Sequence, residues 1–188
     1  MSGVHERHEV GVPLLILVTG PPGSGKSAVA ESIAAMTRAS VLGHDWAMSA
    51  LRPYPPLQDA LDTMEPAGHR VVGWSIVIAL AREQLRNGRS VVLDGVARTP
   101  ETTTCREAAR REGARWLLVS TRCSDRAVHR SRIVDRRRDI PDWYELEWAH
   151  VEESLAGWEP PDGVDLGLDT TDPWEENVSR IRELLGTR

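Results

Sequence analysis

The sequence predicts an α/β fold, a three-layer sandwich in which a five-stranded parallel sheet with strand order 2-3-1-4-5 lies between helices. Apolar runs alternate with helical stretches along the chain, which is the pattern of a parallel sheet covered on both faces. The first run leads directly into a glycine-rich loop. The 188 residues, 40% of them hydrophobic and 27% charged, suit one globular domain.

Five apolar runs are expected to form the strands. The first is continuous over residues 13–20, as in a central strand buried on both faces. The others occupy residues 40–45, 90–96, 115–121 and 164–170. Helices are expected after the glycine-rich loop, over 71–86, 99–113 and 125–138, and at the C-terminal end. The proline-rich segment RPYPPLQ, residues 52–58, is expected to be irregular.

The only lysine of the chain, Lys26, lies in a glycine-rich loop between a predicted strand and a predicted helix. The spacing Gly20-x-x-x-x-Gly25-Lys26-Ser27 in that context is a Walker A motif, which predicts a P-loop NTPase fold. Backbone N–H groups at the start of the helix surround phosphate oxygens, and a compact ammonium group fits where the planar fork of arginine does not. The expected nucleotide-binding residues of the loop are Gly20, Pro21, Pro22, Gly23, Ser24, Gly25, Lys26, Ser27 and Ala28. The alternative interpretation is a glycine turn with an incidental lysine.

Two other classes of P-loop protein fit the sequence less well than a kinase. A GTPase requires an Asn-Lys-x-Asp motif, and the chain has no second lysine. A motor or AAA-type ATPase follows its acidic strand with Asp-Glu, whereas Gly95 follows Asp94 here. The net charge of −5 argues against general nucleic-acid binding. Without an export signal or a run long enough for a bilayer, we expect a cytoplasmic protein with no membrane contact.

Two carboxylates follow strands of the predicted sheet. Asp94 ends the third strand, where an acid holds Mg²⁺ together with Ser27 or lies at the acceptor. The alternative for Asp94 is a strand-end turn. Asp45 ends the second strand and is a candidate base for an acceptor hydroxyl, or else the cap of a short helix. Arg52 and Arg98 complete the candidate acceptor site, with a solvated surface position as the alternative for Arg52.

An arginine-rich stretch lies within residues 124–141, and we expect it to form a lid. At i,i+4, Arg132 and Arg136 would share one helix face and stabilise the transferred phosphoryl group. A basic solvated helix or a nucleic-acid contact are the alternatives. Three tryptophans, Trp46, Trp74 and Trp143, either line an acceptor pocket or anchor the core.

With these motifs in place, the chain resembles the small P-loop kinases. The closest pattern is that of the predicted-kinase group that includes polynucleotide 5′-hydroxyl kinase domains, chloramphenicol phosphotransferase and zeta-toxin-like kinases. The resemblance rests on the segments GPPGSGKS, HDWAMSALR, VVLDG, HRSRIVDRRRD and LDTTDPWEENVSRI. It implies that Asp45 is the general base, that Arg132 and Arg136 are lid arginines, and that the loop from Thr170 to Pro173 flanks adenine.

These observations predict an ATP- and Mg²⁺-dependent kinase whose acceptor is a small molecule with a hydroxyl group. Residues 1–12 are expected to be a flexible N-terminus and residues 13–188 a single P-loop kinase domain. Two alternatives remain open at this point. One is a polynucleotide or tRNA 5′-hydroxyl kinase, and the other is a nucleotide-binding regulatory module without turnover.

Overall fold

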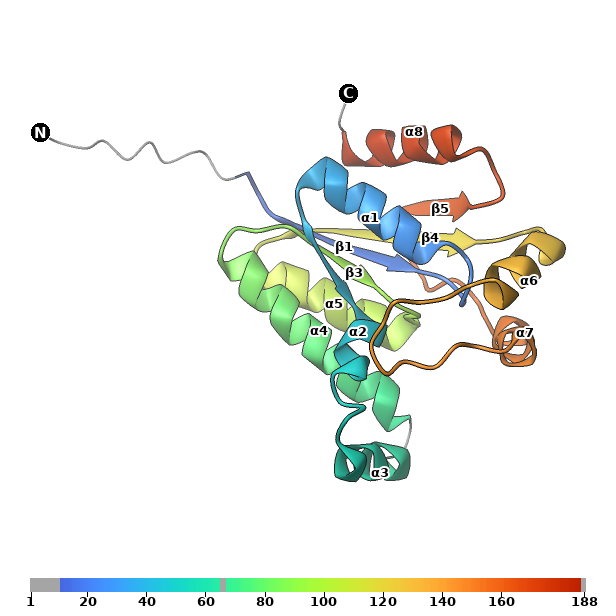
Figure 1. The fold of residues 1–188 in the computed structure, drawn as a ribbon. Coiled ribbons are helices and arrows are strands. Elements are labelled where there is room, and N and C mark those ends of the chain that lie inside the picture. Colours follow the sequence, from blue (N-terminus) through green and yellow to red (C-terminus); the bar gives the residue numbers. More distant parts are fainter. Residues whose placement is uncertain (1–10, 65–66, 187–188) are drawn as a thin grey trace, which may run out of the picture.

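The sheet has five strands in the order β2-β3-β1-β4-β5, and every neighbouring pair is parallel (Figure 1). The computed structural model describes residues 11–64 and 67–186, so most of the expected flexible N-terminus lies outside the described residues. The strands are β1 (Leu14–Thr19), β2 (Ser40–Gly43), β3 (Val91–Asp94), β4 (Arg115–Arg122) and β5 (Leu166–Asp169). The predicted fold class and strand order are confirmed.

Helices cover both faces of the sheet, with α1 and α8 on one face and α4 and α5 on the other (Figure 1). The helices are α1 (Lys26–Thr37), α2 (His44–Ser49), α3 (Pro55–Thr63), α4 (Gly68–Arg86), α5 (Thr99–Arg111), α6 (Arg126–Val134), α7 (Trp148–Ala156) and α8 (Trp174–Leu185). In the described part of the chain, none of these helices has the length and apolarity to cross a membrane.

The central strand β1 is buried on both faces, as its continuous apolar run predicts. Ile16 and Val18 pack with Ile33 of α1 on one face. Leu15 and Leu17 belong to the second cluster, on the face covered by α4 and α5. Each such side chain contributes about 1.5–3 kcal/mol through burial of apolar surface. The strand that carries the glycine-rich loop is therefore the best-anchored element of the sheet.

The prediction that the proline-rich segment is irregular holds for residues 52–54 but is wrong from Pro55 on, where α3 begins. Pro55 and Pro56 occupy the first helical positions, where a backbone N–H has no intrahelical acceptor and its absence in proline costs no hydrogen bond. The fixed φ of proline also suits a helix. Leu61 on this helix is buried. Proline at a helix start thus nucleates an element in a segment that reads as a loop.

The arginine-rich helix is shorter than expected, because α6 ends at Val134 and Asp135 is its C-cap. Arg136 lies beyond the helix, so Arg132 and Arg136 do not share a helix face. The segment after the helix is held by a local and a tertiary contact of Arg138: its backbone N–H donates to Glu145 Oε1 over 2.6 Å, and its Nη1 donates to Asp45 Oδ2 over 2.9 Å. Helix α7, which follows this segment, was not predicted from the sequence.

Candidate active site

The glycine-rich loop between β1 and α1 has the tight turn of a phosphate-binding loop. The backbone N–H of Ser24 donates to the carbonyl of Pro21 over 3.2 Å, and the buried Ser24 hydroxyl lies 2.7 Å from that of Thr121 on β4. Gly25 is the N-cap of α1 with a φ of 83°, a left-handed conformation that favours glycine. The loop therefore opens directly into the positive end of a helix.

Two glycines of the loop lie in contact with segments that are distant in the sequence. A Cβ on Gly23 would lie 2.7 Å from Ile133 Cδ1 of α6, and one on Gly25 would lie 2.8 Å from Thr170 Cγ2, after β5. Both distances are too short for a side chain. These glycines therefore let α6 and the loop after β5 pack directly on the phosphate-binding loop.

Lys26 is held inside this loop. Its Nζ donates a hydrogen bond to the carbonyl oxygen of Pro21 over 3.0 Å. Burial lowers the pKa of Lys26, although the charges of Asp94 and Asp45 oppose that shift. The ammonium group thus lies in the field of both carboxylates that the sequence singles out.

Asp94 ends β3 beside the central strand, in register with Val18. Burial raises the pKa of Asp94, and the charge of Lys26 and a hydrogen bond from Ser27 offset only part of that shift. Among the described residues, no atom forms a hydrogen bond with the buried Asp94 Oδ1. An orphaned carboxylate oxygen beside a serine hydroxyl has the hard oxygen chemistry that Mg²⁺ requires.

Ser27 and Asp94 are the residues that would hold this cation. No cluster of three or more His, Cys, Asp or Glu side chains that could hold a metal occurs in the described part of the chain. One carboxylate and one serine hydroxyl suit Mg²⁺, which binds proteins through one or two carboxylates and completes its shell with phosphates and water.

Asp45 lies in the first turn of α2, directly after β2. The N-cap of this helix is Gly43, so Asp45 does not cap it. Its Oδ2 lies 2.9 Å from Arg138 Nη1, and its Oδ1 lies 3.5 Å from His44 Nδ1. Burial alone would raise the pKa of Asp45, but His44, Arg138 and Lys26 together lower it below its ordinary value. The carboxylate is therefore ionised and able to accept a proton or a hydrogen bond.

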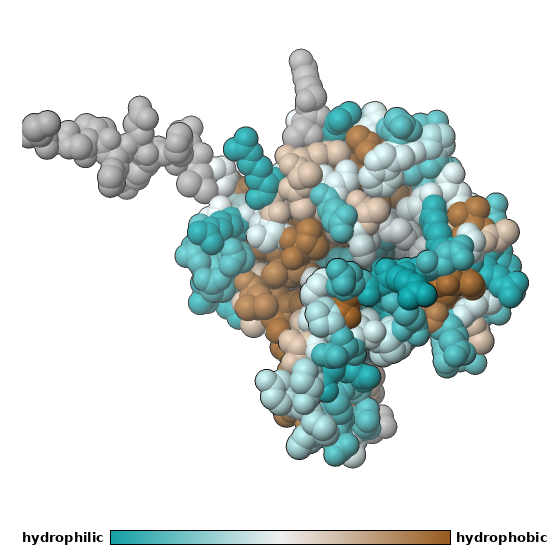
Figure 2. Space-filling view, viewed as in Figure 1, coloured by the Kyte–Doolittle hydropathy of each residue, from teal (hydrophilic) through white to brown (hydrophobic). Residues whose placement is uncertain are grey.

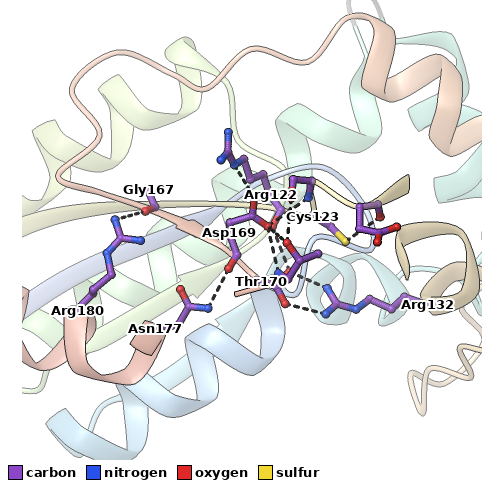
Figure 3. Close-up of polar contacts among 11 residues, drawn as sticks. Arg122, Cys123, Arg132, Gly167, Asp169, Thr170, Asn177 and Arg180 are labelled. Atoms are coloured by element: carbon purple, nitrogen blue, oxygen red, sulfur yellow. Dashed lines mark hydrogen bonds and ion pairs between the residues drawn. The ribbon is translucent and has the colours of Figure 1, made fainter. Parts of the chain in front are cut away.

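Helix α6 contacts both the phosphate-binding loop and the loop after β5. His129 is buried, and its Nε2 lies 2.7 Å from the carbonyl oxygen of Pro22. Arg132 donates two hydrogen bonds to Thr170, one to Oγ1 over 2.6 Å and one to the carbonyl oxygen over 2.8 Å (Figure 3). These contacts place Arg132 at the edge of the phosphate-binding loop.

Asp169 organises the loop after β5 (Figure 3). Its carboxylate accepts hydrogen bonds from Arg122 Nε over 3.0 Å, Ser124 N over 3.2 Å and Thr171 Oγ1 over 2.6 Å. Burial would raise the pKa of Asp169, but the hydrogen bonds from Thr171 and Ser124 hold it well below its ordinary value. The loop that presents Thr170 to Arg132 is thus fixed by one ionised carboxylate.

Two adjoining hollows bring most of the predicted site residues together. The smaller, about 260 Å³, lies over the phosphate-binding loop and is lined by Gly23, Gly25, Lys26, Ser27, Ala28, Arg132 and Arg136. The larger, about 650 Å³, contains Asp45 and Asp94, and Lys26, Ser27 and Arg136 line both hollows. A phosphate chain in the first hollow would therefore end at the entrance to the second.

Seven predicted site residues line neither hollow. Gly20, Pro21 and Ser24 belong to the phosphate-binding loop and Thr170 contacts Arg132, whereas Arg52, Arg98 and Pro173 lie farther from the site. Arg52 donates to the carbonyl of Asp142 over 3.4 Å and lines a separate surface hollow. Arg98 is exposed at the N-cap of α5, and Pro173 is exposed at the N-cap of α8. Of the three tryptophans, Trp46 and Trp143 line the larger hollow, whereas Trp74 is buried in the core.

Two residues that contact the site were not selected from the sequence. His129 lies three positions before Arg132, so both occupy the same side of α6, a spacing that could have indicated it. Arg138 pairs with Asp45, which lies 93 residues away in the chain, and no local sequence pattern predicts that contact.

Comparison with known proteins supports a nucleotide-binding assignment. Residues 15–161 match the AAA domain family. A UPF0200 protein of Aeropyrum pernix is 30% identical over 139 residues, which cover 71% of this chain and 70% of that protein. An uncharacterized protein of Mycobacterium tuberculosis is 29% identical over 173 residues, which cover 88% of this chain and 33% of that protein. This chain thus spans about a third of the length of the first curated relatives that it matches.

Several solved kinase structures share the fold. A sugar kinase from Janibacter sp. HTCC2649 has a TM-score of 0.66 at 17% identity, covering 93% of this chain and 95% of that chain. A gluconokinase from Sinorhizobium meliloti 1021 has a TM-score of 0.60 at 22% identity, covering 93% of each chain. The APS kinase of Mycobacterium tuberculosis in complex with AMPPNP and APS has a TM-score of 0.60 at 18% identity, covering 94% of this chain and 99% of that chain. The fold is therefore that of the small P-loop kinases, as the resemblance implied.

Proposed function

This chain belongs to the AAA domain family, and from that premise we propose that it is an ATP-dependent kinase that phosphorylates a hydroxyl group of a small molecule. The observation that carries the proposal is the shared lining of one cavity by Lys26 and Asp45. The first belongs to the phosphate-binding loop, and the second is an ionised carboxylate in the first turn of α2, directly after β2. A donor phosphate and an acceptor hydroxyl can meet between them.

The residue after Asp94 favours phosphoryl transfer to an alcohol over hydrolysis, because it has no side chain that could activate water. An ATPase of the motor type carries there a glutamate that activates water, whereas this chain has Gly95. A Cβ at that position would lie 2.9 Å from both His44 Cβ and Trp74 Cζ2, so no side chain fits. Three carboxylates line the cavity, and we assign Asp94 to the cation and Asp45 to the incoming hydroxyl, while Glu31 lies on α1.

Phosphoryl transfer requires alignment and neutralisation of charge more than covalent chemistry. In the proposed mechanism, Asp45 accepts the hydrogen bond of the acceptor hydroxyl and then its proton as the oxygen attacks the γ-phosphorus. Lys26, Arg132 and Arg136 neutralise the charge on the transferred group and on the departing ADP. A Mg²⁺ ion held by Ser27 and Asp94 would supply further positive charge to the phosphates. The loop from Thr170 to Pro173 is proposed to flank adenine.

A two-part experiment tests the proposal. Isothermal calorimetry with AMPPNP and Mg²⁺ should detect binding to the wild-type protein and at least about a hundredfold weaker binding to Lys26→Met. ATP consumption is then screened over sugars, nucleosides, aminoglycosides, neutral aromatic alcohols and 5′-hydroxyl oligonucleotides. Turnover with one small-molecule class is expected.

Asp45→Asn is the control for chemistry, and it should bind AMPPNP normally while turnover falls by about a hundredfold or more. Nucleotide binding without phosphorylation of any compound would instead indicate a regulatory module. Turnover confined to oligonucleotides, with strong inhibition by salt, would indicate a polynucleotide kinase.

A further inference from the structure

We propose that the acceptor is a neutral alcohol with a bulky apolar body, rather than a sugar, a nucleotide or another anionic compound. This inference rests on the proposed kinase function and concerns the larger hollow next to Asp45. Its volume of about 650 Å³ is that of a site for a drug-sized molecule.

The walls of this hollow are mostly hydrocarbon. They come from β2, α2, α4, the end of β3 and the segment after α6, which surround the carboxylate of Asp45. The apolar and aromatic residues are Val41, Leu42, Trp46, Ala47, Val77, Leu80, Val96, Ile140, Trp143, Tyr144 and Leu146. A hydroxyl directed at Asp45 would therefore carry the rest of its molecule onto an apolar surface.

Several of these side chains remain exposed to solvent at the edge of the hollow. The exposed fraction is 55% for Trp46, 49% for Leu80 and 52% for Tyr144. Figure 2 shows a hydrophobic area beside α4, next to the hydrophilic atoms that surround it. Tyr144 stacks on Trp143 with ring centroids 5.0 Å apart, which adds a flat aromatic wall. Exposed apolar surface that converges on a carboxylate is typical of a ligand site.

Neutral polar partners are nearly absent from the same walls. Of the described residues that line the hollow, only Ser27 and Tyr144 carry a neutral hydroxyl, and none is Thr, Asn, Gln or His. The other neutral donors among these side chains are the indole N–H groups of Trp46 and Trp143. A sugar ring or a nucleobase would therefore exchange many of its hydrogen bonds to water for contact with hydrocarbon, which is unfavourable. Asp45 satisfies one hydroxyl, and most of the surrounding wall offers hydrocarbon to the others.

The charges that line the hollow are already balanced. Three carboxylates, Glu31, Asp45 and Asp94, face three cations, Lys26, Arg136 and Arg138. Lys26 and Arg136 also line the smaller hollow, over the phosphate-binding loop. Arg138 is engaged by Asp45, by Glu145 and by the carbonyl of Tyr144. Every cation that lines the hollow is therefore committed either to the phosphates or to Asp45. An anionic acceptor would find no free positive charge among them.

Matched acceptors test the inference. We would compare kcat/KM for glycerol with that for 3-phenoxypropane-1,2-diol, and for glucose with that for phenyl β-D-glucopyranoside. A third comparison uses 4-(2,3-dihydroxypropoxy)benzoate, which is 3-phenoxypropane-1,2-diol with a negatively charged carboxylate at position 4 of its ring. The phenyl compounds should exceed their parents by about tenfold or more, because the ring buries apolar surface. The carboxylate should lose most of that gain.

Two leucines of similar exposure provide the protein control. Leu80→Ala removes part of the apolar wall, whereas Leu57 is 45% exposed on α3 and lines none of the hollows described above. Leu80→Ala should lower kcat/KM for the phenyl compounds about threefold or more without weakening AMPPNP binding. Leu57→Ala should leave both unchanged.

The outcomes separate this inference from the proposed function. Phosphorylation of glycerol, glucose or the carboxylate as efficiently as the neutral phenyl compounds would overturn the inference and leave the kinase assignment standing. Absence of phosphorylation of every compound, with AMPPNP bound, would overturn the kinase assignment. In that case, calorimetric titration of the AMPPNP-loaded protein decides the inference, because equal binding of glycerol and 3-phenoxypropane-1,2-diol would refute it.

Discussion

Arg138 and Asp45 form an ion pair, with Arg138 Nη1 2.9 Å from Asp45 Oδ2, that joins two segments 93 residues apart in the chain. The Arg138 side chain is only 6% exposed and also contacts Glu145. In Figure 1 the orange segment that follows α6 passes beside α2, where Asp45 lies. Asp45, the proposed base, is therefore oriented and kept ionised by the segment after α6, which also forms one wall of the larger hollow.

Replacement of Arg138 by alanine should shift the pH dependence of turnover. Arg138 lowers the pKa of Asp45, so its loss raises that pKa and moves the acidic limb of the kcat profile to higher pH. We also expect a loss of about 1–3 kcal/mol in the free energy of unfolding. Arg137→Ala is the matched control, because Arg137 is exposed and lines neither hollow of the site. Superimposable profiles for the two variants would contradict the role of Arg138.

Lys26→Arg should preserve the charge but not the function. The ammonium group fits inside the loop against the Pro21 carbonyl, whereas the guanidinium fork is broader and planar. We expect AMPPNP affinity or kcat to fall by about a hundredfold, with a melting temperature close to that of the wild-type protein. Calorimetry and steady-state kinetics measure the two quantities. Wild-type turnover in this variant would show that the loop requires only positive charge.

His129→Ala should weaken the attachment of α6 to the phosphate-binding loop. The variant loses the hydrogen bond to the Pro22 carbonyl and the edge-on contact with Trp148, whose ring centroid is 5.4 Å away. We expect a loss of about 1–3 kcal/mol in stability to urea and a rise of about threefold in KM for ATP. His150→Ala, an exposed position on α7, should change neither quantity. His129→Gln should partly rescue the variant if the hydrogen bond is responsible.

Asp169 should make stability depend on pH. Its pKa in the folded protein is depressed, so its stabilising contribution is complete above the ordinary carboxylate pKa and is lost as the pH falls toward the folded value. The free energy of unfolding should therefore decline between about pH 5 and about pH 2. Asp169→Asn should flatten this decline, because its side chain no longer titrates. Parallel pH curves for the two proteins would assign the acid sensitivity to other carboxylates.

The strands and the phosphate-binding loop could be predicted because their signals are local, whereas the strand order is that of the P-loop fold which the Walker A motif indicates. The run over residues 13–20 is apolar throughout, and the glycines, lysine and serine that follow occupy consecutive positions. Each local preference agrees with the position of β1 at the centre of the sheet. Such agreement between levels is what makes a segment predictable.

The helix boundaries around the site could not be predicted in the same way. A helix was expected to continue to residue 138, but α6 ends at Val134, and Arg138 pairs with Asp45 of α2. Similarly, α3 forms at a proline pair that reads as a loop. In both segments, tertiary contacts and position within the helix outweigh intrinsic propensity.

The positions of the strands and of the phosphate-binding loop follow from the sequence alone, because they depend on patterns within a few residues of one another. The Walker A motif within that loop then indicates the fold class and its strand order. The folded protein was needed to show that Arg138 pairs with Asp45, that Arg52 and Arg98 lie away from the hollows, and that the wall beside Asp45 is apolar. The physical reason is that these relationships depend on how elements from separate parts of the chain pack together. A local pattern contains no information on such contacts.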